Sequence, residues 1–439
     1  DPATTYTTVT MSDRGTDGDA VAGDGVFSAV IPGQAANQLV AFYISATNNF
    51  GVATRFPVLL NDNTPARECL VLFGDGNPGG SFGVYHLWLT QANVTRWANL
   101  GNLSNEGIDG TMVYANRVIY NMQAHYAGSP VHQGYNTPTG NLCSYKWIFN
   151  DDDQFLGATS FNKIHVPGNT DNDPTYQREQ LANSFLRALG VPWLNRRDVV
   201  VYVNGNRRGP FMEDAQTPGS DLVKEYFPND TDGYLYKVTR WYEFGPFQSG
   251  YAQPNKLASE AMLLPFTTTG SAKKTARYRW SFQNRRTPDS QNNYTDLFTL
   301  IDAASVHGAP NYVANMENIA DMENWMRVFA ANHAAGNWDC FGCSSGQNLY
   351  AYTGTQGTKW SLMMFDFNIG LGIDGSYPPG QNLFTTLGAD TNVTAIYNTP
   401  TFRRMYWRAL GELVANGPLN RPKLPGIPGI DSFKGHSFH

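Results

Sequence analysis

The sequence is short of charged residues and has no long apolar run. Only 15% of its 439 residues are Asp, Glu, Lys or Arg, against about a quarter in an average soluble protein. No stretch approaches the roughly 18 consecutive apolar residues of a transmembrane helix, so we expect no membrane span. The formal net charge is −6, which argues against nucleic acid as a partner.

The composition is that of a globular protein. Apolar residues make up 41% of the chain and aromatic residues 13%, and the length is enough for two or three domains. Tyr, Asn, Gly and Thr take the place of charge, as in many secreted proteins, so we expect a secreted or cell-surface location. No signal peptide is visible, and the chain begins at Asp1 inside a strand-like pattern. We therefore expect a processed or truncated N-terminus.

Cysteine is scarce as well. The four cysteines are Cys69, Cys143, Cys340 and Cys343, and the last two form a CxxC pair. A single such pair, with no second pair and no neighbouring His in the sequence, argues against zinc. The sequence leaves open whether the pair forms a local disulfide or stays as two thiols.

Residues 1 to about 60 alternate polar and apolar side chains, with turn clusters at short intervals. We predict a small β-sandwich of immunoglobulin or fibronectin type over residues 1–62, with its first strands missing if the N-terminus is truncated. One loop carries four carboxylates that could hold Ca²⁺, namely Asp13, Asp17, Asp19 and Asp24. Their spacing is not that of an EF-hand, and Asp and Gly also build turns, so turns are favoured over Ca²⁺.

The stretch GNWDCFGCSSGQNLYAYTGTQGTKWSLMMFDFNIGLG, residues 336–372, predicts a β-hairpin. Strand-like LYAYT and KWSLMMF flank a turn from Gly354 to Gly357, whose glycines suit a hairpin connection. In an antiparallel hairpin the first residue of one strand lies beside the last residue of its partner. Asn348 and Asp366 occupy these two positions, so we predict that they are neighbours.

Asp339 precedes this hairpin on a loop that can fold back over both residues. Asp, Asn and Asp at one end of a hairpin make a hard-oxygen site, suited to Mg²⁺ or Mn²⁺ with phosphate. Protein kinases combine a base Asp with a metal-binding Asn and Asp in this order, although this chain has neither their usual spacing nor an HRD or DFG string. The alternative is that Asn348 caps a turn and Asp366 merely ends a strand.

Two upstream segments could bind the phosphates of a nucleotide. Lys146 lies in the apolar strand YKWIF, where it is either an edge-strand Lys that reaches water or the nucleotide-phosphate Lys of kinases. Lys163, in FNKIHV, is the alternative candidate for this role.

A helix is predicted over residues 173–190, with Glu179 at the border of its apolar face. Glu179 either stabilises the helix N-terminus through the dipole or enters a cleft to pair with Lys146.

The remaining segments predict structure more than chemistry. Lys237 lies in the predicted strand GYLYKV. We expect its side chain to face the nucleotide cleft, so it is a further candidate for ATP binding. Residues 314–335 predict one amphipathic helix that supports the loop after it, with His333 as a packed core residue. The basic cluster at 273–286 is interpreted as a solvated face rather than a docking site. The Pro- and Gly-rich residues 418–439 are expected to form a linker or tail.

The strings NWD, QNLY and FDFNIG together resemble the signature of the atypical kinases of the spore-coat kinase (CotH) family. The LGVP that follows the predicted Glu179 helix agrees with it, and the resemblance extends from roughly Cys69 to Leu419. It implies an α+β fold, in which an atypical bilobal protein-kinase-like domain spans residues 63–417 after the immunoglobulin-like sandwich. It also implies transfer of phosphate from ATP, with Mg²⁺ or Mn²⁺, to Ser or Thr of a protein substrate or of the chain itself.

The resemblance implies roles for single residues. Asp339 becomes the catalytic base, and the metal ligands become Asn348, Asp366 and Asn368. It favours the pairing of Lys146 with Glu179. It places Glu213 at the segment joining the two lobes, with the adenine near residues 211–214, and a phosphate loop at Gly128 and Ser129.

Three departures from the family weaken parts of this interpretation. Ala127 stands where the family has the Arg of an Arg-Gly-Ser loop. Phe365 stands where a Trp often precedes the metal-binding Asp. Asn368 replaces a second acidic residue, so less negative charge would face the metal. The alternative function is a non-catalytic cell-surface or filament-forming protein that keeps the kinase-like fold for binding surface partners.

Overall fold

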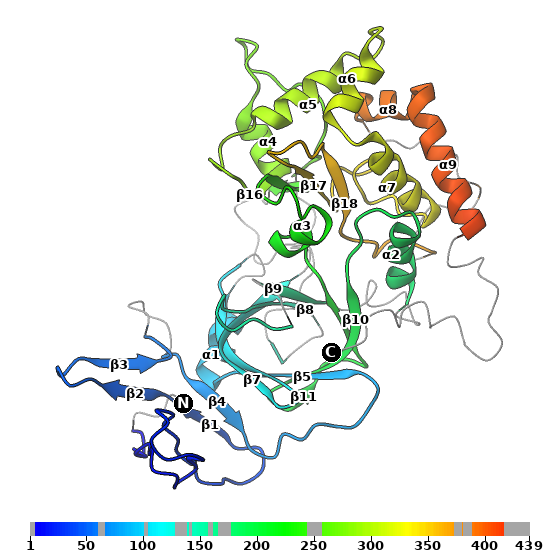
Figure 1. Cartoon of the computed structure of the whole chain (residues 1–439). Coiled ribbons are helices and arrows are strands. Elements are labelled where there is room, and N and C mark those ends of the chain that lie inside the picture. The colour runs from blue at the N-terminus through cyan, green and yellow to red at the C-terminus, as the bar shows by residue number, and fades with distance from the viewer. Residues whose placement is uncertain are drawn as a thin grey trace. The chain divides into compact units, whose positions relative to one another are not determined.

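The protein is described here from a computed structural model. Its described residues are 5–59, 66–100, 104–127, 138–139, 143–156, 161–165, 177–243, 257–372, 380 and 389–416. The chain divides into two compact units (Figure 1): Asp1–Val166 with Arg197–Asp214, and Pro167–Arg196 with Ala215–His439. Both units contain helices and sheets, which confirms the expected α+β class.

The start of the first unit forms two short strand pairs. β1 (Leu39–Phe42) pairs with β4 (Cys69–Leu72), and β2 (Ile44–Thr47) pairs with β3 (Ala53–Phe56), both antiparallel. The immunoglobulin-like sandwich predicted for residues 1–62 is not confirmed. The pairing of β1 with β4 also crosses the predicted boundary at residue 63.

The first unit is built around an eight-stranded sheet with the order β11-β10-β12-β9-β8-β7-β6-β5. β10, the second strand in this order, also pairs in parallel with β5, the last strand. The sheet therefore closes on itself through these two strands. Its core contains fully buried aromatic side chains, among them Tyr85, Trp147 and Phe155. The strands are β5 (Gly83–Trp88), β6 (Ile108–Tyr114), β7 (Arg117–Ala127), β8 (Ser144–Ile148), β9 (Phe161–His165), β10 (Arg196–Val203), β11 (Asn206–Arg207) and β12 (Met212–Ala215), with α1 (Gln91–Asn99) after β5.

Two turns of this sheet contain residues with a positive φ. The β10–β11 turn is Asn204-Gly205, and both residues have positive φ, 47° and 78°, as a type I′ hairpin turn requires. The β6–β7 turn is at Ala115-Asn116, where Ala115 has φ 51°.

The second unit contains a four-stranded antiparallel sheet with the order β16-β13-β17-β18. Its strands are β13 (Tyr234–Val238), β16 (Phe282–Arg286), β17 (Leu349–Thr353) and β18 (Ser361–Met364), and β14 (Trp241–Glu243) pairs separately with β15 (Leu257–Ser259). Its helices are α2 (Arg178–Ala188), α3 (Ser220–Tyr226), α4 (Thr275–Ser281), α5 (Thr295–Ser305), α6 (Tyr312–Ile319), α7 (Met322–Ala334), α8 (Thr391–Asn398) and α9 (Pro400–Asn416). Among the described residues, no helix has the length and apolar content needed to cross a membrane.

The single helix predicted over residues 314–335 is wrong, because the chain breaks it into α6 and α7 at Ala320. The backbone of Trp360, which precedes β18, takes the hydrogen bonds at the break: its N–H donates to Ile319, and its carbonyl accepts from Asp321. The Asp321 side chain then caps α7 by accepting the N–H of Asn324 at 3.0 Å. The break therefore fixes the start of α7 against β18, the strand that leads to Asp366.

Helix α7 is the centre of the second unit. It packs against α9, β18 and α2, and Trp325, Met326 and Phe329 on it are at most 1% exposed. His333 is 4% exposed, in agreement with its interpretation as a core residue. Gly336 to Asp339 follow directly, so the loop of the predicted site begins from a fully packed helix.

The turn between β17 and β18 is held by an aspartate from another segment. Asp230 accepts the backbone N–H groups of Thr355, Gln356 and Thr358 at 2.9 to 3.0 Å. Burial acts to raise the pKa of Asp230, but these donors outweigh it and lower the pKa below its ordinary value. Gly354 leaves room for this contact, because a Cβ there would overlap the Asp230 carboxylate.

We expect Asp230→Asn to lower the free energy of unfolding by about 2 kcal/mol, since it removes a charged acceptor of several N–H groups. A carboxylate with a lowered folded pKa stabilises the fold above its unfolded pKa of about 4, and this contribution is lost as the pH falls through the folded value. Urea unfolding of both proteins from about pH 6 to pH 3 measures the effect.

The matched control is Asp232→Asn, since the Asp232 side chain is 73% exposed. The wild type and Asp232→Asn should lose stability in parallel on acidification, and Asp230→Asn should lose less. The same loss in all three proteins would contradict the role given to Asp230.

Candidate functional site

The β17–β18 hairpin places Asn348 and Asp366 at one end. Leu349 lies opposite Met364 in the register, and the N–H of Phe365 donates to the carbonyl of Asn348 at 3.2 Å. Asp366 is the next residue along the chain. The neighbourhood predicted from the turn chemistry is therefore present in the fold.

Asp339 joins this pair through hydrogen bonds. The Asn348 side-chain amide donates to the Asp339 carbonyl at 2.7 Å and to its carboxylate at 3.3 Å, and Gln347 donates to the same carboxylate at 2.5 Å. Asn348 has a positive φ of 61°, which Asn tolerates better than most residues. The loop thus folds back over the hairpin end.

The surroundings of Asp339 set its acidity. Burial raises its pKa, and the charge of Asp366 adds to this effect. Hydrogen bonds from Gln347 and Ser345 and the charge of Arg240 act in the opposite direction, but the net pKa remains above the ordinary value. Two carboxylates close enough to influence each other in this way are typical of a site that receives a cation.

Asn337 ties the loop to the hairpin. It is 1% exposed, and its amide nitrogen donates to the side chain of Asn332 at 2.9 Å and to the carbonyl of Asp366 at 3.2 Å. Its oxygen accepts the N–H of Asp339 at 3.2 Å. The sequence alone does not reveal this role, although Asn337 stands within the NWD string.

The loop after β18 turns at once. The N–H of Asn368 donates to the Asp366 carboxylate at 3.0 Å, which is an Asx-type turn. Asn368 is therefore close to Asp366, as a further metal ligand has to be. Its backbone N–H, however, already binds one oxygen of the Asp366 carboxylate.

Cationic side chains surround this end of the hairpin. Lys237, on β13, lies 5.7 Å from the ring of Phe365. Arg196 donates to the carbonyl of Phe365 at 3.3 Å. Arg240 donates to Ser345 at 2.7 Å and pairs with Glu260 at 2.5 Å. Lys237 was predicted from the sequence, whereas Arg196 and Arg240 were not, because neither lies in a recognisable motif.

Glu179 has a partner that the sequence did not reveal. The Arg196 guanidinium lies 2.7 Å from its carboxylate, and the two side chains are 5% and 1% exposed. Glu179 is on α2, so this ion pair connects the helix to the carbonyl of Phe365 beside Asp366. Lys146 and Glu179 belong to different units, and their pairing stays a prediction.

The candidates in the first unit lie on its large sheet. Lys146, on β8, is half-buried, and the register places it between His125 on β7 and Lys163 on β9. The pKa of His125 is lowered by burial and by the charge of Lys146. Lys146 therefore lies opposite one residue on each neighbouring strand, and its positive charge acts against protonation of His125.

The other first-unit candidates are less defined. Glu213 is fully buried on β12, next to Asp214, which accepts from Tyr85 and Arg197 at 2.7 and 2.8 Å. Gly128 and Ser129 lie outside the described residues.

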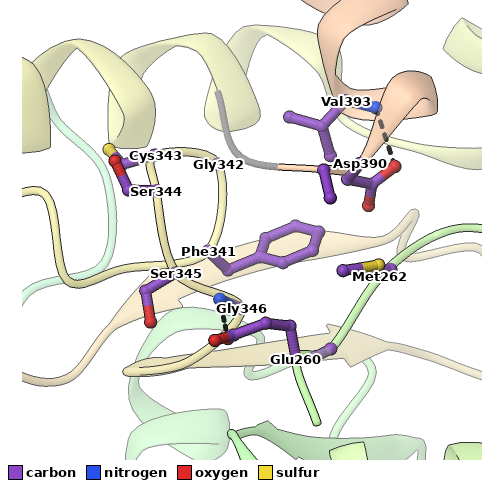
Figure 2. A pocket seen from close by; sticks show the side chains of 12 residues that line it. Glu260, Met262, Phe341, Gly342, Cys343, Ser344, Ser345, Gly346, Asp390 and Val393 are labelled. Carbon is purple, nitrogen blue, oxygen red and sulfur yellow. Dashed lines mark hydrogen bonds between the residues drawn. The ribbon is translucent and has the colours of Figure 1, made fainter. Parts of the chain in front are cut away.

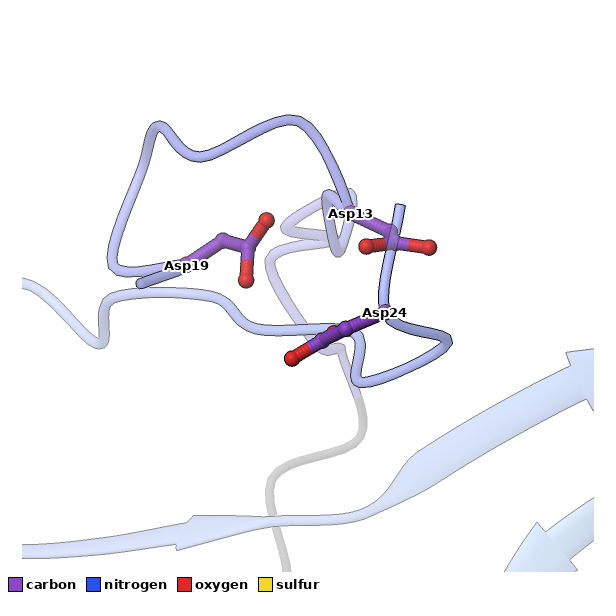
Figure 3. A group of neighbouring side chains, drawn as sticks. All are labelled: Asp13, Asp19 and Asp24. Carbon is purple, nitrogen blue, oxygen red and sulfur yellow. The ribbon is translucent and has the colours of Figure 1, made fainter. Parts of the chain in front are cut away.

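The acidic loop near the N-terminus brings three carboxylates together (Figure 3). Ligand oxygens of Asp13, Asp19 and Asp24 lie within 4.8 Å of one another, and Asp17 is not part of the group. Backbone N–H groups already bind all three, among them Gly15 on Asp19 and Gly23 on Asp13. These bonds are those of a turn, and the Ca²⁺ alternative stays a prediction.

The residues at the hairpin end fit a hard divalent cation. Asp366 supplies carboxylate oxygens, with the carboxylate of Asp339 near it, and the Asn348 amide, whose nitrogen faces Asp339, leaves its oxygen as the atom that a metal would take. These are the ligand types that Mg²⁺ and Mn²⁺ prefer.

Comparison with known proteins gives one extended match. A family model described as "CotH kinase protein" matches residues 144–424, more than half of the chain. A segment of 27 residues is 67% identical to the FAD-binding monooxygenase hmp7 of Hypomyces subiculosus, covering 6% of this chain and 4% of that protein. Because this second match is so short, it supports no inference about flavin chemistry.

The Glu179–Arg196 pair generates a prediction about stability. We expect Glu179→Leu to lower the free energy of unfolding by about 3 kcal/mol or more, because it leaves the buried Arg196 guanidinium without its carboxylate. Arg196→Met should be destabilising as well. The double variant should be more stable than the sum of the single effects predicts, and denaturant unfolding of the four proteins measures this difference.

Strict additivity of the two effects would contradict an energetic coupling between Glu179 and Arg196. The Asp232→Asn protein serves again as the control for a surface charge, since its loss should leave the unfolding free energy within about 0.5 kcal/mol.

Proposed function

Because this chain belongs to the CotH kinase family, we propose that it transfers the γ-phosphate of ATP to Ser or Thr hydroxyls of a protein substrate or of itself. The single observation that carries the proposal is the meeting of Asp339, Asn348 and Asp366 at one end of the β17–β18 hairpin. Phosphoryl transfer needs mainly positioning and neutralisation of charge, and these residues are suited to both.

Asp366 and Asn348 would hold the divalent cation. A bound Mg²⁺ or Mn²⁺ ion would neutralise the phosphate oxygens and fix their position. Asn368 would be a weaker third ligand, since it lacks the charge of a carboxylate and its backbone already binds Asp366.

Asp339 would orient the substrate hydroxyl and accept its proton. Its carboxylate is fixed by Gln347 and Asn348, so it has little freedom to move when a substrate binds. A raised pKa makes a carboxylate a better proton acceptor, provided that it is ionised at the working pH.

Lys237 would contribute positive charge near the ring of Phe365, the residue before Asp366, and Arg196 would position the same strand end through the carbonyl of Phe365. The roles of Lys146, Glu213, Gly128 and Ser129 in binding ATP are supported by the family resemblance alone. The low content of charged residues, 15%, supports a further proposal that the protein works outside the cytoplasm.

ATP with Mn²⁺ should raise the melting temperature of the protein. At a ligand concentration of 100 times Kd the expected stabilisation is about 2.7 kcal/mol. Asp366→Ala should abolish the shift, whereas Asp302→Ala, which removes an exposed partner of Lys273, should retain it. A thermal-shift assay measures all three proteins, and the absence of any shift in the wild type would favour the non-catalytic surface protein.

Asp339→Asn should separate binding from catalysis. We expect phosphate incorporation into casein or into the protein itself to fall by at least about 100-fold, because the amide cannot accept the proton. The Mn²⁺–ATP thermal shift should persist. Incorporation within about twofold of the wild type would exclude Asp339 as the base.

A further inference from the structure

We propose that Cys340 and Cys343 form a reversible thiol–disulfide site, which is oxidised by exchange with a low-molecular-weight disulfide. The two residues lie in the second unit, in the loop that follows Asp339. The site does not depend on ATP binding, so the inference stands or falls independently of the proposed kinase activity.

A tight turn brings the two sulfurs together. The N–H of Cys343 donates to the carbonyl of Cys340 at 3.0 Å, the bond that closes a β-turn. The two Sγ atoms are 3.0 Å apart, with the Cys340 thiol donating, and both cysteines are free. A disulfide bond is about 2.0 Å long, so a shift of roughly 1 Å separates the two states.

The backbone of the turn is fixed by its neighbours. Gly342 has a φ of 91°, and a Cβ at this position would overlap the ring of Phe329. The Tyr397 hydroxyl donates to the carbonyl of Gly342 at 2.9 Å, and the N–H of Phe341 donates to Gln347 at 2.7 Å. The sulfurs are therefore held close by the fold, without a covalent bond between them.

Cys343 is assigned as the sulfur that reacts first. It is one of the residues that line a pocket (Figure 2), whereas Cys340 is not, and the two residues are 2% and 0% exposed. Burial acts to raise the pKa of Cys343, but the hydrogen bond from Cys340 and the neighbouring His333 outweigh it and lower the pKa. Because the imidazole of His333 lies beside Cys343, we assign Cys343 as the nucleophile and Cys340 as the resolving thiol.

His333 is held beside this thiolate. Its Nδ1 forms a 2.6 Å hydrogen bond with the Tyr406 hydroxyl, and its ring stacks on Tyr397. Its Nε2 is buried without a well-aligned hydrogen-bond partner in the described part of the chain. An imidazole fixed in this way can stabilise the negative charge on Cys343.

The ligand set favours a redox pair over a zinc site. A structural zinc ion takes four protein ligands. Within the described ranges, these cysteines belong to no group of three or more His, Cys, Asp or Glu ligands close enough to share an ion.

The exchange balances without a further reactant. The Cys343 thiolate attacks one sulfur of the small disulfide and releases the first thiolate, leaving a mixed disulfide on Cys343. Cys340 loses its proton and attacks the Cys343 sulfur, which releases the second thiolate. The protein is oxidised by two electrons, and the small disulfide is reduced to one thiol and one thiolate. The thiol carries the proton lost by Cys340, and the thiolate takes from solvent the proton that Cys343 released when it ionised.

The experiment equilibrates the native full chain with mixtures of reduced and oxidised glutathione. Acid quenching, alkylation and peptide mapping then give the fraction of each cysteine that is oxidised. We expect a 340–343 disulfide to form in one two-electron transition, while Cys69 and Cys143 stay alkylated as internal controls. Its equilibrium constant should be at least about tenfold larger than in the same chain unfolded in guanidinium chloride, because the native turn holds the sulfurs together.

Two results would overturn the inference: full alkylation of Cys340 and Cys343 across all mixtures, or an equilibrium constant no larger in the folded chain than in the unfolded one. Because both measurements use the unmodified protein, they do not depend on the folding of a variant. Cys343→Ser adds a check on the order of attack. It should prevent the stable mixed disulfide with glutathione that Cys340→Ser should accumulate, and the reverse pattern would overturn the assignment of Cys343.

Discussion

The antiparallel register of β17 with β18 is the constraint on which the candidate site depends. Leu349 opposite Met364 places Asn348 beside Phe365 and hence next to Asp366. A slip of one residue would move every side chain of a strand to the other face and would separate these ligands. The register is fixed twice, by the N–H groups of the turn on Asp230 and by the backbone bonds of Trp360 at the break between α6 and α7.

The same end of the hairpin collects buried polar groups that a purely stabilising core would avoid. Asn337 is 1% exposed, and the side chains of Glu179 and Arg196 are 1% and 5% exposed. Asn337 donates to the carbonyl of Asp366 and Arg196 donates to that of Phe365. Glu179 is linked to Phe365 through its ion pair with Arg196. Buried ion pairs add little net stability compared with apolar packing. Their concentration beside Asp366 is more readily explained by the need to hold one carboxylate and one amide in a fixed place.

Sequence reasoning succeeded where the determinants are local. Gly354 and Gly357 mark the hairpin turn, Asn204-Gly205 marks another, and the apolar stripe of α7 predicts its buried face.

Sequence reasoning failed where distant segments compete for the same backbone groups. The break at Ala320 depends on Trp360, forty residues away in the chain, and nothing in the helical pattern reveals it. Arg196 could not be foreseen as the partner of Glu179, because an Arg at the start of a strand has no motif and the sequence offered Lys146 instead. The nearness of the Cys340 and Cys343 sulfurs is again local, since a CxxC turn brings them together, although the contribution of His333 required the packing of α7.

The central claim is that Asn348 and Asp366 hold a divalent cation with Asp339 beside them. The most direct test is anomalous diffraction at the manganese edge from crystals of the protein soaked with Mn²⁺ and a non-hydrolysable ATP analogue. The account predicts a manganese peak about 2.0–2.3 Å from a carboxylate oxygen of Asp366 and from the side-chain oxygen of Asn348, with the phosphates of the analogue on its other side. A bound analogue whose manganese lies away from both residues would contradict it.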